Sequence, residues 1–468
     1  MRVAFIQNFF EELTGPLILC ELLERQGHRV KFFLPERAWT RKLKAFSPEM
    51  VAMSVCTGEH PGMLETASWV KKFLDPAPLV VMGGPHPTFF PEVIEHPCVD
   101  AICRGEGENA FPAFAASING KGPAVDVDGF WIKREGRVYK NPPAHLVEDL
   151  DQIPIPSRKN LFTDYPFIQK LPFRKMITGR GCPYNCSYCY NRALKDILKG
   201  KGRYLRRRSV THVVDEAAYL KRTFGTKFID FNDDIFTVDP DWILEFSDQY
   251  ASRVKVPFCC NVRVDRLDEQ GAKALARAGC RVVKFGLESG DEYFRRTVLN
   301  KSTTDDDIRR CAEILHAAGM KIQTYNMLGL PGETLQQAMK TVRLNQEIKP
   351  YYAWCSLAQP YPGTAMAEQF AQAPEQVKDQ VEHCPASWFD TSIAPLEDRE
   401  RLINLHKFFA LLVRFPKLEP LVMKLVELPE NGLFRAVYQA VYGLHMKAMV
   451  KASWPRVLSM YLKLRKQY

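Results

Sequence analysis

The stretch Cys182-Pro-Tyr-Asn-Cys186-Ser-Tyr-Cys189 follows a short apolar strand predicted at Lys175–Thr178, and the rest of the chain is organised around it. Its three thiolates, separated by three and then two residues, have the spacing to wrap one corner of a cubane. A 4Fe–4S cluster normally has four Cys ligands, so three leave one iron open to another ligand. The preceding Gly-Arg-Gly at 179–181 gives the loop the backbone freedom to fold around a cluster.

An aromatic residue, Tyr188, stands directly before the last cysteine. With it, the motif resembles the signature of the radical S-adenosylmethionine (SAM) superfamily. The resemblance implies that Cys182, Cys186 and Cys189 hold a 4Fe–4S cluster whose open iron chelates the amino and carboxylate groups of SAM. We also expect Tyr188 to contact adenine through its backbone, with core packing as the alternative role.

Bulk properties indicate a globular cytoplasmic protein. A chain of 468 residues predicts about two to four domains. The ten cysteines outside the motif are scattered, which favours reduced thiols and gives no sign of a second cluster. The apolar run at Val3–Ile6 is too short for a signal peptide, and no run approaches the ~18 residues of a membrane span.

Residues 1–125 alternate predicted strands and helices, which indicates an α/β, doubly wound, Rossmann-like domain with a parallel sheet. Such sheets bind ligands at the carboxyl ends of their strands. The residues there are small and polar, so backbone can approach a ligand closely. They are Ser54-Val-Cys-Thr57, Gly83-Gly-Pro-His-Pro-Thr88 and Gly105-Glu-Gly-Glu108. Tight turns of a purely structural domain are the alternative.

The order of these strand ends resembles the cobalamin-binding domain that precedes many radical SAM cores. The resemblance implies that Ser54, Thr57, Gly83 and Gly84 line the cavity for the nucleotide tail of cobalamin. The loop at 7–15 lacks the Asp-x-His-x-x-Gly motif whose His ligates cobalt in the wider family. We therefore expect cobalamin without a histidine ligand from this loop. We expect His28 to be a surface or helix-capping residue and His60, on a loop, to be solvated, with an approach to a ligand as the alternative for His60.

Residues 126–170 are predicted to connect two domains through a small hairpin and a Pro-punctuated extended strap. Residues 171–375 then repeat six βα units, which predicts a partial (β/α)6 TIM-like barrel with function at the carboxyl ends of its strands. The predicted strands are Lys175–Thr178, Lys227–Phe231, Phe258–Asn261, Arg281–Phe285, Gln323–Leu328 and Trp354–Leu357.

Polar residues gather at these barrel strand ends, and each suits a part of SAM. Asp233 or Asp234 suits the amino group, which is a cation. Asn261 and Glu288, with the adjoining Ser289, suit the ribose hydroxyls. The strand end that contains Gly329 and Pro331 suits adenine. The family usually has Gly-Gly-Glu where this chain has Asn-Asp-Asp at 232–234, and helix capping or a solvated turn is the alternative for each carboxylate.

The segment 376–468 is predicted to be a basic, amphipathic, helical tail. From Arg401 to Tyr468, twelve Lys and Arg residues stand against three Glu, a net charge of +9 in a chain of +10. Basic amphipathic helices are typical of membrane surfaces, and a helical cap on the barrel is the alternative. Arg206-Arg-Arg208 has no interleaved aromatics, so we expect no nucleic-acid binding and a solvated helix start there.

The resemblance as a whole implies a radical SAM enzyme that functionalises an unactivated carbon. Cobalamin-dependent C-methylation of a hydrophobic small molecule is the first expectation, with a flavodoxin or ferredoxin as electron donor. A radical cyclase of the anaerobic magnesium-protoporphyrin ester cyclase type is the alternative. A cobalamin or redox sensor without turnover is the competing class, and the polar strand ends argue against it because a sensor needs no SAM pocket.

Overall fold

A computed structural model describes residues 1–8, 10–118, 122–171, 173–361, 363–370, 392, 394, 396 and 398–450. The chain divides into two compact units, each built around its own parallel sheet. Unit 1 comprises Met1–Leu171 with Ala193–Arg208, and unit 2 comprises Pro172–Arg192 with the chain from Ser209 onward. The predicted boundary at 375 lies outside the described residues.

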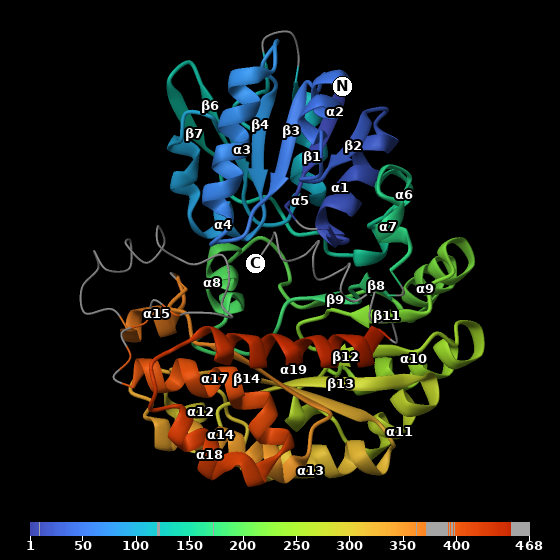
Figure 1. Cartoon of the computed structure of the whole chain (residues 1–468). Coiled ribbons are helices and arrows are strands. Elements are labelled where there is room, and N and C mark those ends of the chain that lie inside the picture. Colours follow the sequence, from blue (N-terminus) through green and yellow to red (C-terminus); the bar gives the residue numbers. More distant parts are fainter. Residues whose placement is uncertain are drawn as a thin grey trace. The chain divides into compact units, whose positions relative to one another are not determined.

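Unit 1 contains a seven-stranded sheet in the order β2-β1-β3-β4-β5-β6-β7 (Figure 1). The first five strands run parallel, as the sequence predicts. They are β1 (Arg2–Ile6), β2 (Arg29–Phe33), β3 (Met50–Ser54), β4 (Leu79–Gly83) and β5 (Ala101–Cys103). The hairpin β6 (Phe130–Arg134) and β7 (Arg137–Lys140) joins β5 antiparallel. The segment assigned to a connector therefore contributes the edge of this sheet.

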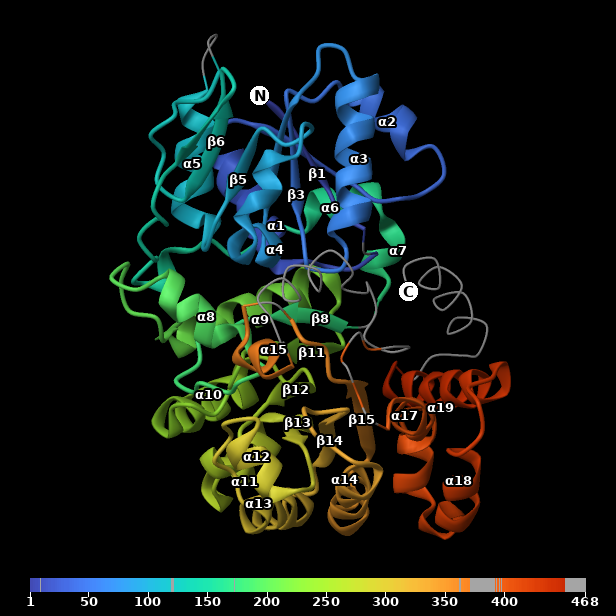
Figure 2. The same cartoon turned by 90° about the vertical axis from the view of Figure 1, so that its left-hand side faces the viewer.

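Helices cover both faces of the unit 1 sheet because alternate residues of its strands are apolar on opposite sides. On one face Val51 and Met53 pack with α2 and α3. On the other, Phe5 lies 6.1 Å from Phe111 of α5, ring centroid to ring centroid. The helices are α1 (Thr14–Arg25), α2 (Trp39–Phe46), α3 (His60–Phe73), α4 (Pro85–Phe89) and α5 (Gly107–Ser117), and Figure 2 shows them around the strands.

The strap after the hairpin packs on unit 1 through the turn η2 (Leu150–Gln152) and two short helices, α6 (Lys159–Asp164) and α7 (Pro166–Gln169). Arg158 is fully buried, and its Nε lies 2.8 Å from Oε2 of Glu12. The prediction of a solvated Arg206 was wrong. Its buried guanidinium donates to both oxygens of Glu106, at 2.5 and 3.0 Å, and to the carbonyl of Val147 at 2.7 Å, and so joins the strap to the start of α5.

Unit 2 contains a six-stranded, all-parallel sheet in the order β15-β14-β13-β12-β11-β8, as expected for the partial barrel. Its strands are β8 (Phe173–Met176), β11 (Phe228–Phe231), β12 (Phe258–Asn261), β13 (Cys280–Glu288), β14 (Lys321–Leu328) and β15 (Tyr352–Leu357). Of two further strands of two residues each, β9 (Gly179–Arg180) belongs to unit 2 and β10 (Arg206–Arg207) belongs to unit 1.

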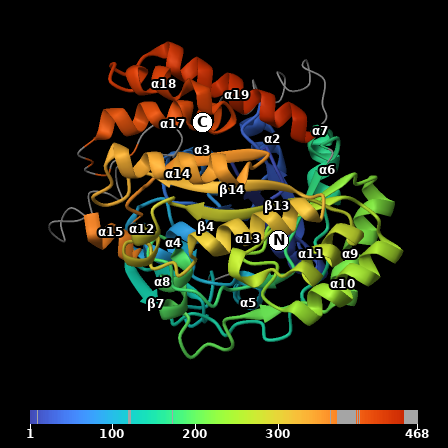
Figure 3. The same cartoon turned by 90° about the horizontal axis from the view of Figure 1, so that it is seen from below.

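One face of this sheet is apolar and covered by helices (Figure 3). Ile229, Phe231, Phe258, Val283 and Phe285 form its centre, each at most 1% exposed. The helices begin at well-formed caps, such as the capping box of Thr304 and Asp307. They are α9 (Val210–Phe224), α10 (Pro240–Arg253), α11 (Glu269–Ala278), α13 (Asp305–Ala317) and α14 (Leu335–Ile348). The shorter α12 (Glu292–Thr297) and α15 (Ala365–Phe370) pack in a separate apolar cluster, and α8 spans Tyr190–Ile197.

The C-terminal helices lie beside β15 and α14 (Figure 2). They are α17 (Arg399–Arg414), the turn η4 (Pro416–Leu418), α18 (Glu419–Leu425) and α19 (Gly432–Val450). Leu402, Leu405, Phe409 and Leu412 of α17 are fully buried against the sheet edge, so α17 caps the barrel. Residues 451–468 of the predicted tail lie outside the described residues. Within the described part of the chain, no helix has both the length and the apolar content to cross a membrane.

Candidate active site

The three cysteines lie on one loop of unit 2, between β9 and α8. The loop is tied to the end of α12 by hydrogen bonds from neighbouring residues. Ser187 donates from its amide to the carbonyl of Leu299 at 3.0 Å and from its hydroxyl to the carbonyl of Val298 at 2.6 Å. The Asn300 amide donates to the carbonyl of Asn185 at 2.9 Å. The loop is therefore held in shape by protein contacts of its own.

The residues around the thiols suit an iron–sulfur cluster. Cys182, Cys186 and Cys189 are all free thiols, and the amide nitrogen of Asn191 lies 3.6 Å from the sulfur of Cys189. Such donors to cluster sulfurs orient the ligands and tune the metal. Burial raises the pKa of Cys182 to about 11, so a bound cation is needed to hold it as a thiolate. Among the described residues, no three His, Cys, Asp or Glu side chains converge on a single-ion site.

The two carboxylates predicted for the SAM amino group differ in their surroundings. Asp233 is 3% exposed, and its Oδ1 accepts from the amide and hydroxyl of Thr178, at 2.9 and 2.7 Å. It thus joins the end of β8 to the end of β11. Asp234 is exposed, accepts a hydrogen bond from the Asn191 side chain, and lies near enough to Cys182 and Cys189 to add to the effect of burial in raising their pKa. The available carboxylate beside the thiols is therefore Asp234.

Asn261, at the end of β12, presents an open acceptor. Its side-chain nitrogen donates to the backbone carbonyl of Asp233 at 2.9 Å. Its Oδ1 is buried and has no hydrogen-bond partner in the structure. Buried polar atoms of this kind are rare and costly, so they mark places where a ligand completes the bonding.

Glu288 links the end of β13 to the cysteine loop. Its Oε1 accepts from the hydroxyl of Tyr188 at 2.9 Å and from Nζ of Lys301 at 3.1 Å. Lys301 also donates to the carbonyl of Gly286 at 2.6 Å. Glu288 itself has φ of +67° at a register shift in the β13–β14 ladder, a conformation that non-glycine residues adopt at a cost. The end of β13 is thus bent at Glu288, and the hydrogen bonds from Tyr188 and Lys301 fix it next to the cysteine loop.

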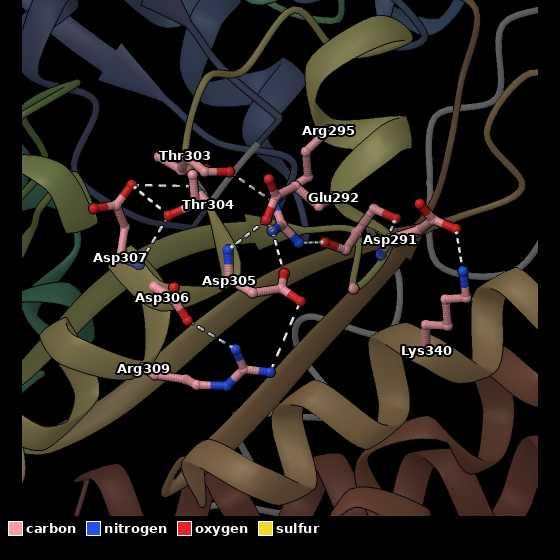
Figure 4. A network of polar contacts seen from close by, with 12 residues as sticks. Asp291, Glu292, Arg295, Thr303, Thr304, Asp305, Asp306, Asp307, Arg309 and Lys340 are labelled. Atoms are coloured by element: carbon pink, nitrogen blue, oxygen red, sulfur yellow. Dashed lines mark hydrogen bonds and ion pairs between the residues drawn. The ribbon is translucent and has the colours of Figure 1, made fainter.

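Ser289 is fully buried and serves the backbone. Its hydroxyl accepts from the amide of Asp291 at 3.2 Å, and its carbonyl accepts from Arg295 at 2.6 Å. Figure 4 shows the surrounding network, in which the fully buried Arg295 also ion-pairs with Asp305 and Glu292. Arg295 and Lys301 are the residues that the sequence analysis missed. Both lie several residues after the end of β13, and no sequence motif predicts residues at that spacing to be part of the site.

The loop that contains Gly329 and Pro331 is folded by a buried carboxylate. Oε2 of Glu333 accepts from the amides of Gly329 and Leu330, at 2.6 and 3.2 Å, while its Oε1 has no hydrogen-bond partner. Burial raises the pKa of Glu333 to about 8, with those two amide bonds opposing the shift. Gly329 has φ of +78°, and a Cβ there would lie 2.7 Å from Leu396. Pro331 is half-buried beside it.

In unit 1, the ends of β3 and β4 form a cradle from backbone and small side chains. Ser54 and Gly83 are register partners at these ends. Gly84 has φ of +91°, and a Cβ there would lie 3.0 Å from both the Ser54 hydroxyl and the Val55 amide nitrogen. A Cβ on Gly83 would meet only Cys103 at 3.6 Å, an ordinary contact. The cradle suits close approach of a large polar group, as a nucleotide tail requires.

Two stacked histidines complete this edge of unit 1. His60 and His86 stack with ring centroids 4.1 Å apart, and His86 Nδ1 lies 3.2 Å from the hydroxyl of Thr57. Burial, and then the nearby His60, lower the pKa of His86 to about 3. The prediction of a solvated His60 was therefore wrong, because α3 begins there and packs the ring inward. His28 is half-buried, with Nδ1 3.2 Å from the N-terminal amine.

Comparison with known proteins finds the radical SAM superfamily profile at residues 176–344 and the B12-binding domain profile at residues 14–115. An uncharacterized methyltransferase of Pyrococcus horikoshii is 32% identical over 371 residues, covering 76% of this chain and 78% of that one. The chain belongs to the radical SAM enzymes with a cobalamin-binding domain. The cofactors of this family are the 4Fe–4S cluster, SAM and cobalamin.

Two further matches bear on this radical SAM enzyme. The anaerobic magnesium-protoporphyrin IX monomethyl ester cyclase of Rubrivivax gelatinosus is 26% identical over 364 residues, 75% of this chain and 62% of the cyclase. The structure of the radical SAM methyltransferase TsrM from Kitasatospora setae with cobalamin and cluster bound has a TM-score of 0.65 at 18% identity, covering 79% of this chain and 78% of TsrM. The second match concerns the fold alone.

Proposed function

We propose that this enzyme transfers a methyl group to an unactivated carbon of a small molecule, using the cluster, SAM and cobalamin. The single observation that carries the proposal is the presence in one chain of two different strand-end sites. One is the cysteine loop with Asp234, Asn261 and Glu288, and the other is the glycine cradle at Gly84. The named methyltransferase relative is also the more similar, at 32% identity against 26% for the cyclase.

The residues of unit 2 divide the recognition of SAM between them. Cys182, Cys186 and Cys189 hold the cluster. The exposed Asp234 accepts from the SAM amino group, because an ammonium and a carboxylate form the stronger, charge-assisted type of hydrogen bond. Asn261 offers its open Oδ1 to the ribose.

Two further strand ends complete the SAM site of the proposal. Glu288, held by Tyr188 and Lys301, faces the ribose with a fixed carboxylate. The backbone at Gly329 and Pro331 faces adenine. Ser289 and Asp233 do not contact SAM in this proposal. They hold the strand ends in place through hydrogen bonds to the backbone.

The residues of unit 1 bind cobalamin around its nucleotide tail. Gly83 and Gly84 let backbone approach the tail, and Ser54 and Thr57 offer hydroxyls to it. The loop at 7–15 contains no histidine, so the chain supplies no cobalt ligand from there. When bound, the cluster with SAM supplies a carbon radical that removes hydrogen, and cobalamin supplies the methyl group. The role of the protein is to hold these groups in register and away from water.

Turnover requires an electron from outside the chain, and a flavodoxin or ferredoxin of the cytoplasm is the donor that fits an iron–sulfur acceptor. The decisive experiment uses anaerobically reconstituted, reduced enzyme with cobalamin and SAM. Release of both 5′-deoxyadenosine and S-adenosylhomocysteine is expected, because the methyl group comes from one SAM molecule and the radical from another. Release of 5′-deoxyadenosine alone would favour the cyclase type of reaction, and release of neither would favour a sensor.

We further propose that the C-terminal helices contact an anionic membrane surface. Of the nine large apolar side chains that are exposed in the described residues, five lie between Phe415 and Leu444. Lys417 and Lys424 lie among them without an ion pair, whereas Glu419, Glu427 and Glu430 are all neutralised by arginines. Each basic residue near an anionic surface contributes about 1 kcal/mol.

Liposome flotation tests this contact. Full-length enzyme should float with vesicles that contain anionic lipid, and rising salt should weaken the binding because it screens the charges. Leu421→Gln with Leu433→Gln should reduce flotation, since both side chains are more than half exposed. The exposed Tyr293→Gln on α12 is the matched control. Equal flotation of all three proteins would contradict the proposal.

A further inference from the structure

The face of the unit 2 sheet that is turned away from the helices has polar side chains, some of them partly exposed and others buried. Closed (β/α) barrels fill this interior with layers of bulky branched side chains. Here every second residue of β11, β14 and β15 toward the strand ends is partly exposed. We call this set the inner face, and its polar members are Lys175, Asp230, Asn232, Cys259, Asn261, Lys284, Gln323, Tyr325, Trp354 and Ser356.

A buried ion pair lies at the centre of the inner face. Nζ of Lys284 lies 2.5 Å from Oδ1 of Asp230, and Lys284 is only 6% exposed. The thiol of Cys259 donates to the same oxygen at 3.0 Å. The Asn232 amide, turned with its nitrogen toward Asp230, donates at 3.2 Å. Asp230 therefore accepts from three neighbours, whereas Lys284 has three N–H donors and, among the described residues, a hydrogen bond to Asp230 only.

The charges of this layer favour an anion. Lys284 keeps N–H donors beyond the one that bonds Asp230, and Lys175, the register partner of Asp230, lies on the same face of the sheet. Burial alone would lower the pKa of Lys284, but Cys259 and Asp230 raise it overall, so the ammonium persists at neutral pH. A buried ion pair contributes little to stability, and apolar residues of the same volume often do as well. Its presence on an otherwise accessible face calls for a functional reason.

Apolar surface adjoins the free donors of Lys284. Tyr325 and Trp354 are register partners in β14 and β15, and their rings meet edge to face with centroids 5.5 Å apart. Tyr325 is also the register partner of Gly286, two residues before Glu288. This aromatic pair therefore lies two residues along the strand from Glu288, which is assigned to SAM. A carbon that reacts with a radical from SAM must be placed next to SAM.

We propose that Lys284, Tyr325 and Trp354 bind the methyl acceptor, and that this acceptor carries an anionic oxygen group on a mainly apolar body. Lys284 holds the carboxylate or phosphate, and the aromatic pair packs against the apolar part. Asp230, Cys259 and Asn232 position the ammonium without touching the acceptor. The inference rests on the proposed methyl transfer, which it narrows to one class of substrate.

The test uses the reconstituted holoenzyme with its cluster oxidised, so that no turnover occurs. Octyl phosphate and octanoate are the anionic probes, and octanol is the neutral one; calorimetry measures binding of each. The wild type should bind an anionic probe at least tenfold more tightly than octanol, and the stronger of the two anions identifies the headgroup. The double variant Lys284→Met with Asp230→Asn, which leaves no buried unpaired charge, should lose that preference. Lys273→Met on the surface of α11 is the control and should keep it.

Three outcomes would overturn the assignment. They are no preference in the wild type, an unchanged preference in the double variant, or loss of SAM affinity by the double variant, which would place Lys284 on SAM instead. Unchanged cluster absorbance and thermal stability in the variant exclude a folding defect. Failure of the proposed methyl transfer is recognised separately, because reduced wild type would then release no S-adenosylhomocysteine whatever it binds.

Discussion

The carboxyl ends of the two parallel sheets present different chemistry although both arise from βα repeats. In unit 1 the strand ends present Gly84, Ser54, Thr57 and a buried neutral His86. In unit 2 they present thiols, carboxylates and the ammonium of Lys301. Neutral, small groups suit a large cofactor that binds by shape and many weak contacts. Charged and metal-binding groups suit a cluster and the cationic amino group of SAM, where each contact is strong and directional.

The comparison also shows how each edge is kept in shape. Unit 1 relies on backbone conformations that only glycine adopts easily, as at Gly84. Unit 2 relies on hydrogen-bonded charges, such as Glu288 with Lys301 and the network of Arg295 in Figure 4. A change of volume should therefore damage the first edge, and a change of charge should damage the second.

The largest expected effect is the complete loss of the cluster at the unit 2 strand ends, with cobalamin binding at the unit 1 strand ends unchanged. Replacing Cys182, Cys186 and Cys189 together with Ala should abolish bound iron, the brown chromophore and all SAM cleavage. Corrinoid binding should remain near one equivalent per chain, because no cradle residue is altered. Iron, sulfide and corrinoid analyses of the same preparation check this, and an unchanged iron content would refute the assignment of the cluster.

Gly84→Ala should damage unit 1 strongly. The residue has φ of +91°, and the added Cβ would lie 3.0 Å from the Ser54 hydroxyl and the Val55 amide nitrogen, closer than ordinary van der Waals contact. We expect a loss of about 3 kcal/mol in the free energy of unfolding, together with weaker corrinoid binding. Gly83→Ala is the matched control, because its Cβ meets only an ordinary contact. Equal effects of the two substitutions would show that the cradle is not tightly packed.

Glu333→Gln should reveal the buried carboxyl of unit 2 through the dependence of stability on pH. Because burial raises the pKa of Glu333 to about 8, the folded chain holds this proton to higher pH than the unfolded chain does. Its stabilising contribution is therefore present at low pH and lost as pH rises toward 8. Between pH 6 and pH 8 the wild type should lose about 2 kcal/mol relative to the variant. Thermal melts of both proteins across this range provide the measurement.

His86→Gln should show the opposite dependence in unit 1. Burial lowers the pKa of His86 to about 3, so the unfolded chain takes up a proton below about pH 6.5 before the folded chain does. The stability that neutral His86 contributes is therefore lost as pH falls. From pH 7 to pH 5.5 the wild type should lose about 1 kcal/mol relative to the variant. Parallel pH profiles of the two proteins would mean that this histidine is not buried.

Several predictions from the sequence depend only on local pattern, and these are confirmed. Hydrophobic periodicity predicts the βα repeats and the parallel sheets, and the motif of Cys182, Cys186 and Cys189 resembles that of the family to which the chain belongs. Local pattern is sufficient there because strand and helix periods, and a cluster motif on one loop, involve residues near one another in the chain.

The sequence by itself thus determined the two folds and the cysteine loop. Only the tertiary structure decided which polar strand-end residues are open to a ligand. Asp233 and Asp234 are adjacent, yet the first bonds Thr178, which follows β8, and the second remains exposed. Lys284 and Asp230 are 54 residues apart and meet on the inner face. Such partners come from different strands, so their pairing depends on the order and register of the sheet, which no segment of the chain contains.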